Sequence, residues 1–152
     1  MSNPRIGVVG IPGKWSTEAL ADALEERTGF RHIVDMGHVD YDLGAGTVTH
    51  RGFDLTTLDG LVVKKISETY SPHALDRLEL LRVAEAKGVK VFSKPDAILR
   101  LMDRLACTVS LALAGAPMPP TRVTEDLDTA RAIVEEFGGG VLKPLFSTKA
   151  RG

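Results

Sequence analysis

Short apolar segments alternate with helix-forming segments through the first part of the chain, and this alternation restricts the fold more than any other feature. Residues 5–10 (RIGVVG) form an apolar run that ends in glycine, which is typical of a buried strand. Residues 16–28 predict a helix with Ser16 as its cap and Gly29 at its end. The alternation continues with predicted strands at residues 31–36, 58–66 and 89–92, a small strand at 47–50, and a helix that starts at residues 71–72 and stops at Gly88. This order predicts an α/β fold, namely a Rossmann-like domain with a mostly parallel sheet and helices on both faces.

The pattern changes at Ser93, so we predict a first domain over residues 1–93 and a second over residues 94–152. The second domain opens with helical segments and continues through a proline-rich connection, because Pro117, Pro119 and Pro120 enforce an extended chain. Its predicted elements are a helix from 94, a helix over 103–114 buried along Leu105, Val109, Ala112 and Leu113, a strand at 121–124, a helix capped by Asp126, and a strand at 141–145.

Composition excludes several classes of protein. The 152 residues carry a formal net charge of −1, which gives no general attraction for nucleic acid or an anionic membrane. The one cysteine, Cys107, cannot form an internal disulfide, and no signal peptide or membrane-spanning run is evident. We therefore expect a cytoplasmic protein with no nucleic-acid or membrane partner. Glu68, His73 and Asp76 do not fall at a standard ligand spacing, so no metal site is predicted within the chain.

The segment that joins the first strand to the first helix has a glycine-rich start, GIPGKWST. It matches neither the Walker phosphate loop nor the dinucleotide-binding fingerprint, because the spacing of its glycines differs from both. The loop still leads into a helix N-terminus, where free backbone N–H groups favour anions. Two interpretations stay open: a tight connection with Lys14 in solvent, or one wall of a substrate cleft formed by Gly10, Gly13 and Lys14.

Two lysines, Lys64 and Lys65, come at the end of the third core strand. Ligands of open parallel sheets bind beyond the carboxyl ends of the strands, so Lys64 is a candidate for contact with an acidic substrate. The alternative is a solvated lysine at the edge of the sheet.

The segment GGGVLKPLFSTKARG at residues 138–152 carries the strongest chemical signal. Lys143 stands inside an apolar run, where a buried ammonium needs a partner such as a phosphate oxygen. Ser147 and Thr148 follow in a loop whose amides and hydroxyls suit the same phosphates. The alternative is a lysine on an edge strand that points to water.

Several segments, taken in order, resemble the ATP-grasp superfamily. The resemblance is to the branch that contains the ribosomal-protein glutamate ligases, with the ATP-grasp enzyme of the GAK system as a candidate inside it. It covers a pre-ATP-grasp domain and the start of the ATP-grasp α+β lobe. The segments are SKPDAI at 93–98, Asp103-Arg104, GAPMPPT at 115–121 and VLKPL at 141–145.

The resemblance implies that Arg104 and Lys143 contact ATP phosphates and that Ser147, Thr148 and Gly152 cover them. Arg104 stands where the family has a lysine, which keeps the charge and changes its geometry. The family loop resembles Phe-Gly-Ser-x-Gly-Arg-Gly, whereas this chain has Ser147 and Ala150 at two of the glycine positions. A stiffer loop is expected from those two replacements.

The resemblance also implies what the chain does not carry, since the family's adenine-contacting and magnesium-binding residues follow this loop. No catalytic residue is therefore assigned, and ATP and Mg²⁺ are expected as cofactors of a longer parent protein. The chain is expected to be a truncated form of that parent.

The function predicted for the parent is ATP-dependent ligation of a carboxylate to an amine or thiol through an acyl phosphate. The substrate would be a small-molecule or peptide carboxylate, and a homo-oligomer is left open. The alternative is a non-catalytic Rossmann-like module that binds a small acidic ligand or a protein partner. A receiver-like or nucleotide-sugar α/β protein is disfavoured, because the proline-rich connections interrupt the short βα units that such a sheet needs.

Overall fold

The computed structural model describes residues 3–69 and 71–145. The chain divides into two compact units, Met1–Leu101 and Met102–Gly152, and each is described by itself. Among the described residues, no helix has both the length and the apolar character required to cross a membrane.

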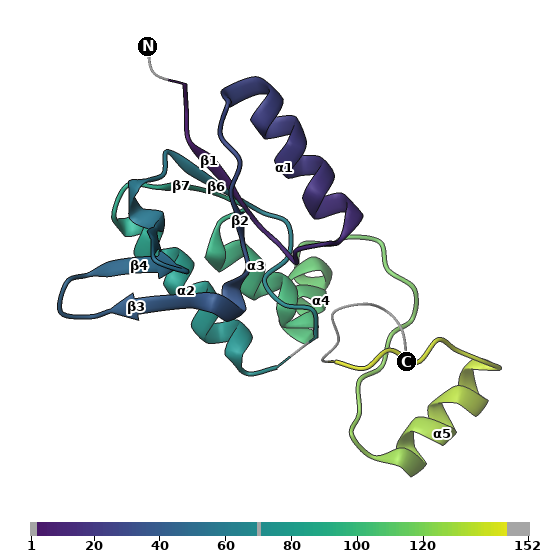
Figure 1. The fold of residues 1–152 in the computed structure, drawn as a ribbon. Helices are drawn as coiled ribbons and strands as arrows, with labels where there is room; N and C mark the ends of the chain where they lie inside the picture. The colour runs from purple at the N-terminus through teal and green to yellow at the C-terminus, as the bar shows by residue number, and fades with distance from the viewer. Residues whose placement is uncertain (1–2, 70, 146–152) are drawn as a thin grey trace. The chain divides into compact units, whose positions relative to one another are not determined.

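The first unit is built on a four-stranded parallel sheet with the strand order β2-β1-β6-β7 (Figure 1). Its strands are β2 (Ile33–Val34), β1 (Ile6–Val9), β6 (Gly60–Val63) and β7 (Lys90–Phe92). Helix α1 (Trp15–Thr28) connects β1 to β2, and helix α2 (His73–Ala86) connects β6 to β7. The step from β1 to β2 and the step from β6 to β7 lead toward opposite edges of the sheet. Because such connections are right-handed, α1 and α2 lie on opposite faces. The predicted α/β fold with a mostly parallel sheet is confirmed.

A second, antiparallel sheet of order β3-β4-β5 lies between β2 and β6 in the sequence. It consists of β3 (Val39–Asp42), β4 (Thr47–His50) and β5 (Phe53–Asp54), with the short 3₁₀ helices Met36–His38 and Leu55–Thr57 on either side. The prediction of a small strand at residues 47–50 is confirmed, whereas β3 and β5 were not predicted. Asp42 shapes the β3–β4 turn, because its carboxylate accepts hydrogen bonds from the amides of Gly44 and Ala45.

The core of the first unit is formed by apolar side chains of the parallel strands and of α2. Apolar residues in and beside the second sheet complete this core. Short strands that are apolar on both faces bury well when helices cover both sides. The buried members include Val8, Val9, Val34, Leu61 and Val91 from the parallel strands, Leu78, Leu81 and Ala84 from α2, and Met36, Val48, Leu55 and Leu58 around the second sheet.

Helix α1 begins at Trp15, so the predicted cap at Ser16 is wrong. The N-cap is Lys14, which makes no side-chain capping bond. The Glu18 carboxylate instead accepts a hydrogen bond of 2.6 Å from the amide of Gly13, which satisfies a donor beside the helix start. Gly29 ends the helix in the left-handed region at φ 72°, as predicted.

Helix α3 (Pro95–Met102) leads to the second unit, which contains α4 (Arg104–Leu113) and α5 (Leu127–Phe137). Asp103 caps α4 and Asp126 caps α5, each by accepting a backbone N–H three residues later. Gly138 closes α5 with a left-handed φ of 68°.

Three predictions for the second unit are wrong. Residues 121–124 and 141–145 form no strand in the described part of the chain, since neither finds a neighbouring strand there to complete its backbone hydrogen bonds. Val141 is 82% exposed. The stripe along α4 is not buried either, with Leu113 85% exposed and no buried residue in the helix. A helix hides an apolar stripe only when another element packs against it.

Candidate functional site

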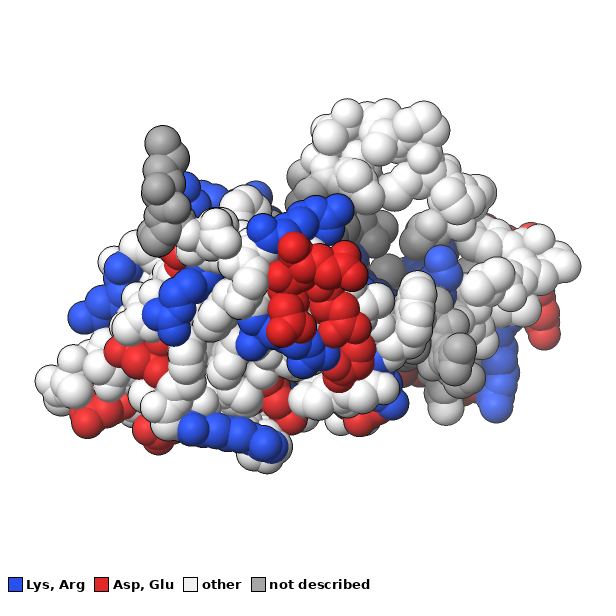
Figure 2. All heavy atoms as spheres, turned by 45° about the horizontal axis from the view of Figure 1, so that its top comes forward, with Lys and Arg blue, Asp and Glu red and all other residues white. Residues whose placement is uncertain are grey.

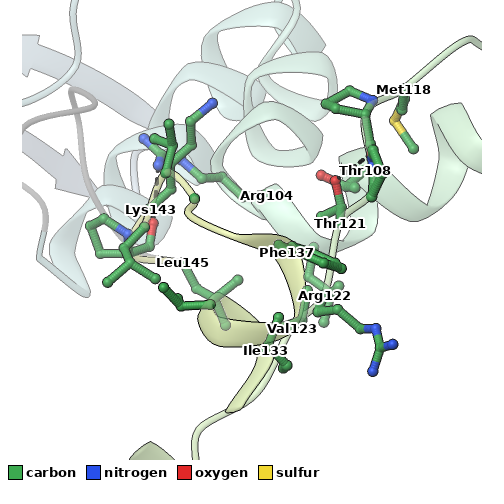
Figure 3. Close-up of a pocket in the computed structure, with 18 of the residues that line it drawn as sticks. Arg104, Thr108, Met118, Thr121, Arg122, Val123, Ile133, Phe137, Lys143 and Leu145 are labelled. Carbon is green, nitrogen blue, oxygen red and sulfur yellow. Dashed lines mark hydrogen bonds between the residues drawn. The ribbon is translucent and has the colours of Figure 1, made fainter. Parts of the chain in front are cut away.

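A pocket of about 760 Å³ lies wholly within the second unit. Its walls come from α4, from the extended segment between α4 and α5, from α5, and from the segment that follows α5. The labelled members are Arg104 and Thr108 of α4, Met118, Thr121, Arg122 and Val123 of the extended segment, Ile133 and Phe137 of α5, and Lys143 and Leu145 (Figure 3).

Arg104 and Lys143 line this pocket together, although they are far apart in the sequence. Arg104 occupies the first position of α4, directly after its Asp103 cap. Its Nη1 donates a hydrogen bond of 3.0 Å to the carbonyl oxygen of Pro144, the residue after Lys143. This contact holds the segment that carries Lys143 against the start of α4, and Figure 3 shows the two cationic residues at the same end of the pocket.

The pocket is basic, because its lining contains three cationic residues and, among the described residues, no aspartate or glutamate. The third cation, Arg122, forms an ion pair with Glu136 at 3.0 Å and lies with its guanidinium over the ring of Phe137. Figure 3 shows Arg122 directed away from the end where Arg104 and Lys143 lie. A ligand with an anionic group would therefore be favoured at the Arg104 and Lys143 end, and an apolar group along the rest of the lining.

Ser147, Thr148 and Gly152, the remaining predicted phosphate-binding residues, lie outside the described residues. Their assignment stays a prediction.

The predicted substrate-cleft residues of the first unit gather at the carboxyl edge of the parallel sheet. Gly10 follows β1, and its amide donates to the carbonyl oxygen of Val34 at 3.0 Å. Lys64 follows β6, and its amide donates to Val9 at 2.9 Å. Lys14 is the N-cap residue of α1 and lies in the loop that follows β1. The structure thus brings Gly10, Lys14 and Lys64 to one edge of the sheet, while their role in binding a substrate stays a prediction.

Two acidic residues, Glu18 and Glu68, contact the loop between β1 and α1, and neither was predicted at this edge. The Lys14 ammonium forms an ion pair of 2.9 Å with Glu68, and the pKa of Glu68 is lowered by that contact. The Gly13 amide is engaged by Glu18, whose pKa is lowered first by this hydrogen bond and then by Arg31. Gly13 therefore presents its amide to a carboxylate of the chain itself. The position of Glu18 in the first helical turn, where capping carboxylates occur, is the signal that could have predicted this contact.

Arg31 holds Glu18 in place through a network on the surface of α1. Its guanidinium contacts Glu18, Asp22 and Glu25. Figure 2 shows acidic side chains gathered with basic ones on the face over α1. This network positions the carboxylate that closes the loop before α1.

Alanine at Gly10 is expected to destabilise the first unit, because the new Cβ would lie 2.6 Å from Cγ2 and 2.7 Å from Oγ1 of the buried Thr17. Overpacking of this kind typically costs about 1–3 kcal/mol. Urea unfolding measures the loss, and the double variant Gly10→Ala/Thr17→Ala should recover part of it. Gly13→Ala is the control for backbone strain alone, since Gly13 has a φ of 76° and nothing within 4 Å of a new Cβ. Equal losses in Gly10→Ala and in the double variant would contradict the steric explanation.

No group of three or more acidic, histidine or cysteine residues within the described ranges is arranged to hold a metal ion.

Comparison with curated proteins finds relatives that are named as alpha-L-glutamate ligases. The chain is 29% identical over 154 residues to a tetrahydromethanopterin:alpha-L-glutamate ligase from Methanosarcina acetivorans, covering 97% of this chain and 48% of the relative. It is 27% identical over 145 residues to a probable alpha-L-glutamate ligase from Teredinibacter turnerae, covering 93% of this chain and 47% of the relative. No protein-family model matches the chain. The chain spans about half the length of these curated relatives.

Solved structures show the same fold. The ATP-grasp ligase PsnB in complex with its minimal precursor superposes with a TM-score of 0.69 at 18% identity, covering 100% of this chain and 55% of that one. A RimK domain ATP-grasp protein from Sphaerobacter thermophilus gives a TM-score of 0.66 at 20% identity, covering 97% of this chain and 52% of that one.

The sequence relatives and the shared fold make the chain similar to ligases of the ATP-grasp class. The predicted resemblance is confirmed: the chain corresponds to an N-terminal portion of such ligases, and its curated relatives are alpha-L-glutamate ligases.

Proposed function

We propose that the protein is an ATP-dependent ligase that joins a carboxylate to an amine or a thiol through an acyl phosphate. The observation that carries the proposal is the shared pocket of Arg104 and Lys143. Two cations at one end of a pocket without acidic lining residues in the described part of the chain suit a polyphosphate, because charge-assisted hydrogen bonds to phosphate oxygens are strong.

In this proposal Arg104 and Lys143 hold the phosphates of ATP, and Ser147, Thr148 and Gly152 cover them. The guanidinium of Arg104 has a planar fork of donors that suits phosphate oxygens, and its Nη1 donates to the carbonyl of Pro144. The ammonium of Lys143 supplies a point charge beside it. The apolar walls of the pocket suit the base of the nucleotide.

The carboxyl edge of the first unit is proposed to contact the carboxylate substrate through Gly10, Gly13, Lys14 and Lys64. Lys14 is the residue best suited to bind an anion, although its ammonium already forms an ion pair with Glu68. The proposed substrate is a small-molecule or peptide carboxylate, because one curated relative is named as a tetrahydromethanopterin:alpha-L-glutamate ligase and PsnB has been solved with a precursor peptide. A cytoplasmic location is part of this proposal.

ATP and Mg²⁺ are the proposed cofactors, and one PsnB structure contains Mg and ADP. The described residues contain no cluster of three or more acidic, histidine or cysteine residues placed to hold a metal ion, so no step is assigned to the metal. The residues of this chain would bind the phosphates, orient them and neutralise their charge, and such positioning accounts for much of phosphoryl-transfer catalysis.

The test is release of ADP from ATP by the protein in its longest natural form, with L-glutamate and candidate carboxylates supplied. ADP release that requires both a carboxylate and an amine or thiol is the expected result. Binding of an acidic ligand without any ATP binding would instead favour the non-catalytic module.

A further inference from the structure

The two sheets of the first unit meet at a pair of histidines. His32 directly precedes β2, and His50 is the last residue of β4. Nδ1 of His50 lies 3.2 Å from Nε2 of His32, and the rings meet edge to face with centroids 5.2 Å apart. His50 is only 7% exposed, and its Nε2 accepts a hydrogen bond of 3.3 Å from the backbone N–H of Asp35. We call His32, His50 and the Asp35 amide the histidine clasp.

The hydrogen-bond network assigns the protons of the clasp. Because the Asp35 amide can only donate, Nε2 of His50 carries no proton, and the neutral His50 ring carries its proton on Nδ1. That Nδ1 donates to Nε2 of His32, so His32 carries its own proton on Nδ1. A proton added to either ring places two donors face to face. Only two neutral rings satisfy both contacts.

The surroundings of the clasp also disfavour positive charge. His32 stacks on Phe53 with a centroid distance of 4.3 Å, and the guanidinium of Arg5 lies 5.3 Å from the same Phe53 ring. Burial lowers the pKa of His32 below its ordinary value, and Arg5 lowers it further.

His50 has more charged neighbours than His32, and their combined effect with burial also lowers its pKa. Burial is the largest cause that lowers the pKa of His50, followed by His32 and Arg51, with His38 adding a smaller effect. Asp35 is the one neighbour among these that raises it.

We propose that the histidine clasp is a pH-sensitive link that joins the two sheets of the first unit while both imidazoles are neutral and opens in mild acid. Opening would release the amide of Asp35, directly after β2. Val34 of β2 accepts the amide of Gly10, so the release would loosen the backbone beside the carboxyl edge of the sheet. The link is independent of the function proposed above.

The sign of the effect follows from proton binding. Both pKa values are lower in the folded state than in the unfolded state, so the unfolded chain binds more protons below the ordinary histidine pKa of about 6.5. The stabilisation is fully present above that pH and is lost as the pH falls below it. Each histidine changes the folding equilibrium constant by up to about tenfold per pH unit, and the pair by up to about a hundredfold.

The experiment is urea unfolding of the chain between about pH 5 and pH 7.5, with His32→Gln/His50→Gln as the test variant. The unmodified chain should lose stability steeply below about pH 6.5, and the double variant should lose this part of the slope. His73→Gln is the matched control, because His73 is an exposed residue of α2 and its variant should keep the slope of the unmodified chain. Equal slopes in the unmodified chain and the double variant would overturn the proposal.

A second measurement decides the matter if the double variant does not fold. Nitrogen-15 NMR of the unmodified chain should show both His32 and His50 protonated on Nδ1 at neutral pH, each with a pKa below 6.5. It should also show protection of the Asp35 amide against exchange that falls as the two rings titrate. A proton on Nε2 of either ring at neutral pH, or titration at or above 6.5, would overturn the assignment.

Discussion

Alanine at position 143 is expected to lower the affinity of the protein for ATP by about ten- to a hundredfold. Lys143 lines the pocket beside Arg104. In the described part of the chain, no acidic side chain lines the pocket, so none would neutralise these cations or repel a bound phosphate. A hydrogen bond to a charged group contributes about 1.5–3 kcal/mol, which corresponds to that range of affinity. Isothermal titration with ATP and magnesium, on the protein in its longest natural form, measures the change.

Arg131→Ala is the matched control for charge, because Arg131 is an exposed cation of α5 that pairs with Asp128 and does not line the pocket. Its affinity for ATP should stay within about twofold of the unmodified protein, as expected for a surface ion pair. An unchanged affinity in Lys143→Ala would remove the basis of the ligase proposal.

Arg104→Ala is expected to weaken ATP binding as well, but not additively with Lys143→Ala. Arg104 also donates to Pro144, so its removal frees the segment that carries Lys143. Residues that share a contact in this way show coupling in a double-mutant cycle. The coupling energy between positions 104 and 143 therefore measures whether the two cations act on one ligand.

Leu61→Ala is expected to lower the free energy of unfolding of the first unit by about 2–5 kcal/mol. Leu61 is 0% exposed and lies on β6, one of the two central strands of the parallel sheet. It pairs with Gly7 of β1, where an added Cβ would lie only 3.1 Å from Cδ2 of Leu61, so the packing around this side chain is tight. The truncated side chain would leave a cavity that the sheet cannot close. Urea unfolding followed by far-ultraviolet circular dichroism gives the change.

Leu43→Ala provides the matched control, since Leu43 is 82% exposed in the turn between β3 and β4. The same chemical change there should alter the free energy of unfolding by no more than about 0.5 kcal/mol. Similar losses at both positions would show that the first unit lacks the core described here.

The parallel sheet could be predicted because its signals are local. The central strands β1 and β6 are short apolar runs, α1 ends at Gly29 in the left-handed region, and α5 begins at the capping residue Asp126. The strands β3 and β5 were missed because β3 alternates polar and apolar residues over only four positions and β5 has two residues. The strands predicted at 121–124 and 141–145 failed for the opposite reason: their residues suit a strand, but no partner strand is described beside them.

For the candidate site too, some features could be predicted from the sequence and others were decided only by the tertiary structure. The sequence by itself determined that Lys143 stands in an apolar segment, that Arg104 lies at the start of a predicted helix, and that Gly10, Lys14 and Lys64 follow strands or precede a helix. Only the tertiary structure decided that Arg104 reaches the residue next to Lys143, that Glu68 pairs with Lys14, and that His32 meets His50. Caps, turns and apolar periodicity depend on neighbours within a few residues, so the sequence displays them directly. Contacts between distant residues depend on how the strands and helices pack, and no short segment carries that information.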